Sequence, residues 1–61
     1  MKLKDYLYFN RITLTSFAKN LGISRSYMNA IVNRGYKPSP RIAKLIEGET
    51  EGKISYFDLI V

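Results

Sequence analysis

One short stretch of the chain carries side chains that could recognise the edges of nucleic-acid bases. Arg25 offers a planar fork of donors, which matches the two acceptors of guanine, and Asn29 offers a donor and an acceptor, which match adenine. Ser24 and Ser26 are shorter hydrogen-bonding side chains, and the Ala30 methyl group suits the methyl group of thymine. The simpler alternative is that Arg25 is a solvated side chain and Asn29 an exposed polar residue.

A second group of residues could bind phosphate, which positions a protein on a nucleic acid without selecting a sequence. Thr13 and Ser39 are each expected to precede a helix, and the unpaired amides of a first helical turn attract anions. The side chains that can donate a hydrogen bond are Thr15, Asn33, Arg34, Tyr36, Lys37, Ser39 and Arg41.

Most of these residues lie in or beside two short helices that the sequence predicts over 14–21 and 25–33. Thr13 is a good N-cap for the first helix, and Gly22 supplies the left-handed conformation that ends it. Ser24 caps the second helix. One apolar stripe on each helix would face the other across the turn. The residues expected to be buried are Phe17, Ala18, Leu21, Ile23, Met28 and Ile31.

This helix pair resembles the helix-turn-helix of the lambda-repressor/Cro-like family. The family pattern is a small residue in the first helix, Gly four positions later, an apolar residue next, and two buried apolar positions in the second helix. This chain has Ala18, Gly22, Ile23, Met28 and Ile31 at those places. The resemblance implies that the second helix lies in the major groove of DNA, while Asn33 and the following loop touch the backbone. An αα-hairpin that binds nothing is the alternative.

The chain departs from the family at one position of the proposed interface. Many members have Gln where this chain has Leu14, and there it helps to hold a base-reading side chain or a phosphate. Leu14 cannot form a hydrogen bond, so a contact there would have to come from Thr13, Thr15 or the backbone. The resemblance covers nearly the whole chain and is strongest over Ile12–Gly35.

Composition argues against several other classes of function. The 61 residues include no cysteine and no histidine, so disulfides, thiolate metal sites and the commonest general base are absent. We expect no metal, no cofactor, no small-molecule substrate and no enzymatic activity. No apolar run approaches the roughly 20 residues that span a bilayer, and Asp5 interrupts the N-terminal stretch where a signal peptide would be apolar. The expected location is cytoplasmic and nucleoid-associated, with no membrane partner.

The charges are separated along the sequence. Residues 1–46 contain nine Lys or Arg and one acid, Asp5, which gives +8, whereas residues 47–61 contain Lys53 and four acids, which gives −3; the sum is the net charge of +5. A polyanionic partner would therefore meet the first part and be repelled by the second. A solvated surface with a lysine excess is the bland alternative.

Two further helices are predicted on either side of this pair. Leu3 and Leu7 give 2–10 an apolar stripe, with Tyr6 between them and Phe9 or Asn10 closing the last turn. The aromatic residues here are expected to pack in the core or at its rim, with Tyr8 exposed.

The second of these helices should start unusually clearly, because Ser39 can cap it and Pro40 suits its first position. Gly35 would end the preceding helix. The helix is expected to run to Glu47, with Gly48 loosening its end and residues 49–53 forming a polar turn. Its inward residues would be Ile42, Leu45 and Ile46.

The segment Ser55–Ile60 is ambiguous. Ser55 and Asp58 have the spacing of a capping box, which favours a helix, whereas the dense β-branched and aromatic content favours a strand. The resemblance favours the helix, since several Cro-like prophage regulators end in a Gly-Lys-apolar-Ser/Thr turn and a short helix, and 52–55 fits that pattern.

Together these features predict one all-α domain over residues 1–61, a compact four- to five-helix bundle of the lambda-repressor type. The expected function is sequence-specific binding of double-stranded DNA, as a transcriptional repressor that occludes an operator. The alternatives are a protein-interaction module, such as an antitoxin or adaptor, and an RNA-binding protein. A homodimer on DNA would use a patch of Tyr56, Phe57, Ile60 and Val61, unless Phe57 and Ile60 close the core of the monomer.

Overall fold

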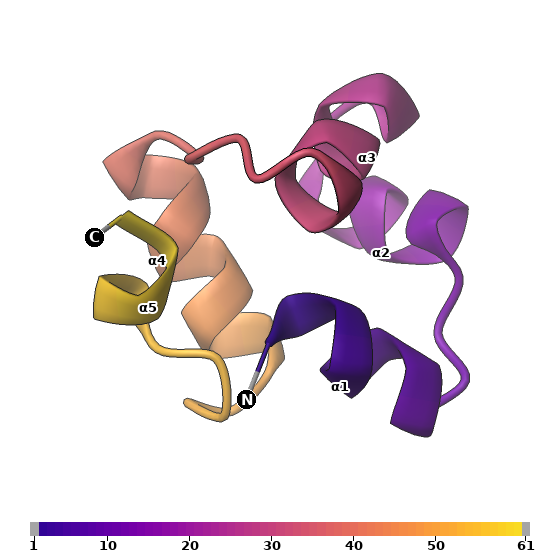
Figure 1. Cartoon of the computed structure of the whole chain (residues 1–61), viewed down its shortest axis with the longest axis horizontal. Coiled ribbons are helices and arrows are strands. Elements are labelled where there is room, and N and C mark those ends of the chain that lie inside the picture. Colours follow the sequence, from indigo (N-terminus) through magenta and orange to yellow (C-terminus); the bar gives the residue numbers. More distant parts are fainter. Residues whose placement is uncertain (1, 61) are drawn as a thin grey trace.

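The computed structural model describes residues 2–60, which form five α-helices and contain no strand (Figure 1). The helices are α1 (Leu3–Phe9), α2 (Leu14–Leu21), α3 (Arg25–Asn33), α4 (Pro40–Glu49) and α5 (Tyr56–Ile60). The predicted all-α class is confirmed, and the segment that was ambiguous is the helix α5. Helix α2 packs against both α3 and α4, α1 packs against α3, and α5 lies along α4.

Three of the helices begin at the predicted hydroxyl caps. Thr13 Oγ1 accepts a hydrogen bond from the Ser16 amide (3.1 Å), Ser24 Oγ from the Tyr27 amide (3.1 Å) and Ser39 Oγ from the Ile42 amide (3.4 Å). Each bond satisfies one of the amides that a helix start leaves without a partner.

Helix α2 ends at the predicted glycine. Gly22 has φ of 74°, the Gly22 amide donates to the Lys19 carbonyl (3.2 Å), and the Ile23 amide donates to the Ala18 carbonyl (3.0 Å). This is the Schellman arrangement, which pairs the last carbonyls of a helix and turns the chain sharply. It sets the direction in which the chain enters α3.

The same arrangement ends α1 and α4 without a glycine in the left-handed position. Arg11 has φ of 54°, and the Ile12 amide donates to the Leu7 carbonyl (2.9 Å). Glu51 has φ of 55°, and the Gly52 amide donates to the Glu47 carbonyl (2.8 Å). A non-glycine residue is uncommon in this conformation, so neither turn was evident in the sequence.

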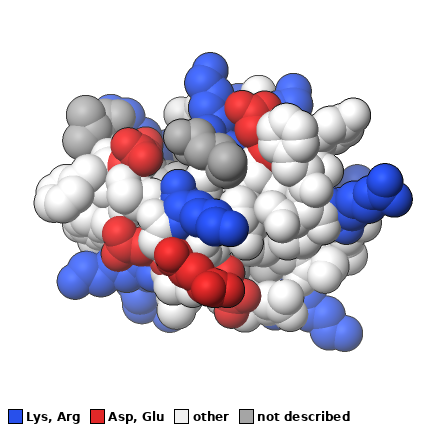
Figure 2. Space-filling view, turned by 90° about the horizontal axis from the view of Figure 1, so that it is seen from below, with Lys and Arg blue, Asp and Glu red and all other residues white. Residues whose placement is uncertain are grey.

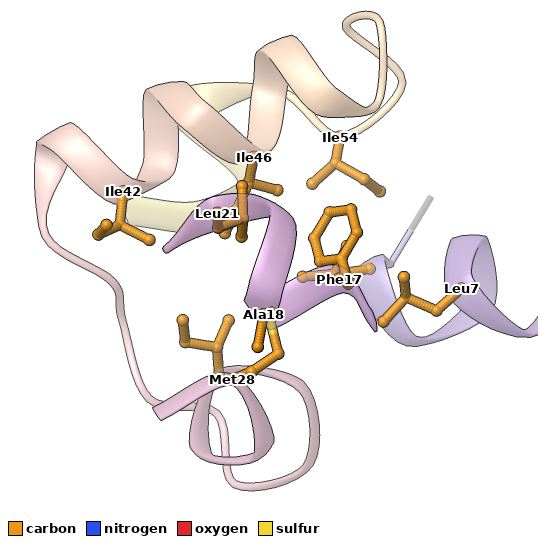
Figure 3. Packing of buried hydrophobic residues seen from close by; sticks show 10 residues of the cluster. Leu7, Phe17, Ala18, Leu21, Met28, Ile42, Ile46 and Ile54 are labelled. Atoms are coloured by element: carbon orange, nitrogen blue, oxygen red, sulfur yellow. The ribbon is translucent and has the colours of Figure 1, made fainter. Parts of the chain in front are cut away.

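The core is one cluster to which every helix contributes a residue or a flanking contact. Phe17 of α2 lies between Leu7 of α1 and Ile54, and Ala18 faces Met28 where α2 crosses α3 (Figure 3). Half-buried residues such as Ile12, Leu14 and Leu59 pack against this cluster. The buried members are Leu3, Leu7, Phe17, Ala18, Leu21, Met28, Ile31, Ile42, Ile46 and Ile54.

Several burial predictions were wrong. Ile23 is half-buried rather than buried, because it follows the Gly22 turn at the edge of the helix crossing. Leu45 is 39% exposed, and Ala43 is buried instead, so the buried face of α4 is rotated from the predicted stripe. Phe9 is 72% exposed and therefore belongs to neither the core nor its rim. Tyr8 is exposed, as expected.

The region after α4 also differs from the prediction. The helix continues through Gly48 to Glu49, and Thr50, expected in a polar turn, is fully buried. The Thr50 hydroxyl donates to the Ile46 carbonyl (2.9 Å) and accepts from the Ile54 amide (3.1 Å). These two bonds replace backbone pairing in the turn, so a polar side chain can be buried there at low cost.

Helix α5 is capped from two sides. Ser55 Oγ accepts from the Asp58 amide (3.1 Å), which is half of the predicted capping box. Glu47 Oε2 of α4 accepts from the Tyr56 amide (3.0 Å), and Lys44 lies 5.8 Å from the centre of the Tyr56 ring. Side chains of α4 thus fix the start of α5.

Candidate nucleic-acid interface

The front of α3 presents the predicted base-contacting side chains to solvent. Ser24, Arg25, Ser26 and Asn29 are all exposed. Arg25 and Asn29 are four residues apart, so they share one face of the helix. Ala30 is half-buried rather than exposed, because it turns toward the flank of the helix. Four of the five candidates are therefore accessible together on one short surface.

Asn29 has a partner that was not predicted, although the i, i+4 spacing within one helix allows it. Asn33 lies one turn further along α3, and its Nδ2 donates to Oδ1 of Asn29. A side-chain amide oxygen has two lone pairs, so Asn29 can still accept a second hydrogen bond while its own Nδ2 donates. Asn33, predicted as a phosphate contact, thus also braces the side chain that would contact a base.

The start of α2 offers two unpaired backbone amides. Thr13 Oγ1 takes the Ser16 amide, which leaves those of Leu14 and Thr15 without an acceptor inside the helix. Thr13 and Thr15 are exposed, whereas Leu14 is half-buried and packs against the core. The residue that replaces the family's Gln therefore contributes packing, and the polar groups beside it remain available to an anion.

The start of α4, predicted as a second anion site, is largely occupied. The Ser39 amide donates to the Tyr27 hydroxyl (3.1 Å), Pro40 has no amide hydrogen, and the Ile42 amide donates to Ser39 Oγ. Only the amide of Arg41 is left in this first turn. The α2 start is the better anion site of the two.

The α3–α4 loop (residues 34–39) carries most of the other predicted phosphate contacts. Gly35 has φ of 68°, and the Tyr36 amide reaches back to the Ala30 carbonyl (3.0 Å). Pro38 is buried, which holds the middle of the loop against the rest of the protein. All the predicted phosphate contacts in the loop and the helix start that follows are exposed: Arg34, Tyr36, Lys37, Ser39 and Arg41.

Tyr27 joins α3 to this loop and is absent from the predicted site. It is half-buried, its hydroxyl accepts from the Ser39 amide, and its ring meets that of Tyr36 edge to face at 5.7 Å between centroids. The bonded groups are twelve residues apart, so the helical pattern of α3 carried no signal for this contact.

Acidic residues are absent from the part of the sequence that forms α2 and α3. The sequence contains no Asp or Glu between residues 6 and 46, a stretch that includes all of α2 and α3. The face seen from below in Figure 2 carries acidic side chains together with Lys and Arg, whereas α3 lies at the top of Figure 1. The exposed front of α3 is therefore free of acidic residues of its own and of its neighbours in sequence, as an anion-binding surface requires.

Within residues 2–60 no group of three or more His, Cys, Asp or Glu could hold a metal ion, and no helix is long and apolar enough to cross a membrane. A groove of about 720 Å³ lies between the start of α1 and α5, where Leu3, Ile54 and Leu59 line it.

Comparison of the chain with protein-family models, curated proteins and solved structures found no match.

Proposed function

We propose that the protein binds double-stranded DNA in a sequence-specific manner, with α2 and α3 as a helix-turn-helix of the lambda-repressor/Cro-like type. In this proposal α3 is the recognition helix and lies in the major groove. Arg25 and Asn29 contact base edges, and Ser24 and Ser26 assist them. The α2 start and the α3–α4 loop contact phosphates on either side.

The observation that carries the proposal is the front of α3. Helix α3 is capped at Ser24, and the Gly22 turn sets its direction. Its exposed front carries Arg25 and Asn29, and Asn33 holds the Asn29 side chain in place. This stretch of sequence contains no acidic residue, and the side chains of Arg25 and Asn29 lie outside the core, so neither is needed to fill it. Bound at an operator, the protein would act as a transcriptional repressor by blocking polymerase.

A selection of bound sites from random duplex DNA tests the proposal. A consensus sequence should emerge, and structured RNA should compete poorly for the protein. Failure to enrich any sequence, with binding equally well inhibited by structured RNA, would instead favour the RNA-binding alternative. A palindromic consensus would also indicate a dimer with two half-sites.

An exposed aromatic residue near the C-terminus favours contact with another protein chain. Phe57 is 69% exposed and forms an edge-to-face pair with Tyr56 at 5.5 Å between ring centroids. The alternative that Phe57 closes the monomer core is therefore wrong, whereas Ile60 is half-buried; Val61 lies outside the described residues. We propose that this C-terminal patch (Tyr56, Phe57 and Ile60) contacts a second copy of the chain on DNA.

A further inference from the structure

We propose that Tyr27 is a positioning residue that holds the α3–α4 loop in register with the recognition helix, so that Lys37 meets a DNA phosphate. The inference rests on the proposed function, because its ligand is the same duplex DNA. It adds a residue that contacts no base and that the helix-turn-helix pattern does not contain.

Tyr27 fastens the loop at two points, one on each side of Lys37. Its ring packs edge to face against Tyr36 at an interplanar angle of 73°, and its hydroxyl accepts from the Ser39 amide at 3.1 Å. Lys37 is exposed between these two points, and Pro38, its neighbour, is buried. Lys37, the only lysine of the loop, thus lies in a short segment that is attached to the recognition helix at both ends.

The Tyr27 hydroxyl supplies a bond that the loop cannot obtain from its own backbone. The Ser39 amide precedes the first turn of α4 and has no helical carbonyl to bind. Gly35, at the other end of the loop, adopts a positive φ and adds conformational freedom when the loop is released. A cation that is already held in place loses less conformational entropy on binding, so the tyrosine raises affinity without selecting a sequence.

The test compares Tyr27→Phe, which removes the hydroxyl and keeps the ring, with Lys37→Ala and with the double variant. Tyr8→Phe is the matched control, because Tyr8 is 78% exposed on α1. Amide hydrogen exchange of residues 36–39 reports on the loop. Affinity for a selected duplex, measured at several salt concentrations, reports on DNA binding. Thermal melts establish that each variant is folded at the temperature used.

We expect Tyr27→Phe to speed exchange of the Ser39 amide and to weaken duplex binding about three- to tenfold, the range typical for loss of one neutral hydrogen bond. Its salt dependence should approach that of Lys37→Ala. The double variant should bind no more weakly than Lys37→Ala alone, because Tyr27 acts through Lys37. Tyr8→Phe should match the parent in every measurement.

Three results would overturn the inference while leaving DNA binding intact. These are unchanged Ser39 exchange in Tyr27→Phe, unchanged affinity in that variant, or losses that add in the double variant, which would show that Tyr27 acts independently of Lys37. If the parent protein itself bound no duplex, the proposed function and this inference would both fall.

Discussion

Arg25 and Lys37 are both exposed cations, yet they occupy different positions on the proposed interface. Arg25 begins α3, and Lys37 lies in the α3–α4 loop. In the proposed complex, side chains at the start of α3 would reach deepest into the groove, and the loop would lie at the level of the DNA backbone. Guanine alone offers two acceptors at the spacing of an arginine fork, whereas a phosphate is the same anion in every sequence.

Arg25→Ala should therefore cost about 1–3 kcal/mol of binding free energy on a preferred duplex and far less on a scrambled one. Lys37→Ala should weaken binding to both duplexes alike and lower the salt slope by about one contact. Both variants should fold normally, since neither side chain belongs to the core. Equal losses for Arg25→Ala on the two duplexes would assign Arg25 to a phosphate and move base recognition to Asn29 and Ser26.

Thr50 is the buried polar residue on which the turn between α4 and α5 depends. Thr50→Val keeps the shape of the side chain but leaves the buried Ile54 amide without its acceptor. The free energy of unfolding should fall by about 1–3 kcal/mol, the desolvation cost of one unpaired group. Thr50→Ser, which retains the hydroxyl, should lose less in a denaturant titration. If Val and Ser were equally stable, the hydroxyl bonds would contribute nothing to the fold.

At the scale of elements, the Gly22 turn decides how α2 and α3 are joined. A Cβ at position 22 would have nothing within 4 Å, so any cost of substitution comes from the backbone conformation alone. Gly22→Val should destabilise the domain by more than about 1 kcal/mol, because a β-branched residue resists a φ of 74°. Gly22→Asn should lose less, since Asn tolerates the left-handed region. If Gly22→Val melted at the same temperature as the parent, the left-handed conformation at Gly22 would not contribute to stability.

The helices that the sequence predicted best are those with strong local signals. Ser and Thr caps and the Gly22 stop are local chemistry, and they placed α2 and α3 correctly. The end of α1 was predicted to within a residue, whereas α4 runs to Glu49 instead of Glu47; in both cases the left-handed residue that forms the turn, Arg11 or Glu51, was not predicted because that conformation usually favours glycine. Gly48 looked like a helix end but is held inside α4 by tertiary packing, since Ile46 before it and Thr50 after it are both buried.

The hydrogen-bond partners of the site residues were harder to predict than their exposure. The positions of Arg25, Asn29 and Lys37 on the surface followed from helix phase and loop position. The brace from Asn33 and the contact between Tyr27 and Ser39 depend on rotamers and on the path of the loop. The prediction that Leu45 is buried was wrong because the small Ala43 occupies the buried face of α4 in its place.

At the scale of the whole molecule, one recognition helix offers few base contacts, so a second copy would extend the site. The C-terminal patch is the surface we propose for that contact, because Phe57 stands exposed beside Tyr56. Sedimentation should show a dimer on palindromic DNA, and Phe57→Ser should weaken it, whereas Phe9→Ser, at the equally exposed Phe9 of α1, should not. A monomer both free and on that DNA would discard the dimer.

The most direct test of the central claim is the affinity for selected and scrambled duplexes as a function of salt concentration. Each phosphate contact should contribute about −0.9 to the slope of log affinity against log salt, so several contacts predict a steep fall in affinity as salt rises. At each salt concentration the selected duplex should bind more tightly than the scrambled one, because only the selected duplex offers the base contacts. A flat response to salt, or no binding to either duplex at low salt, would contradict the account.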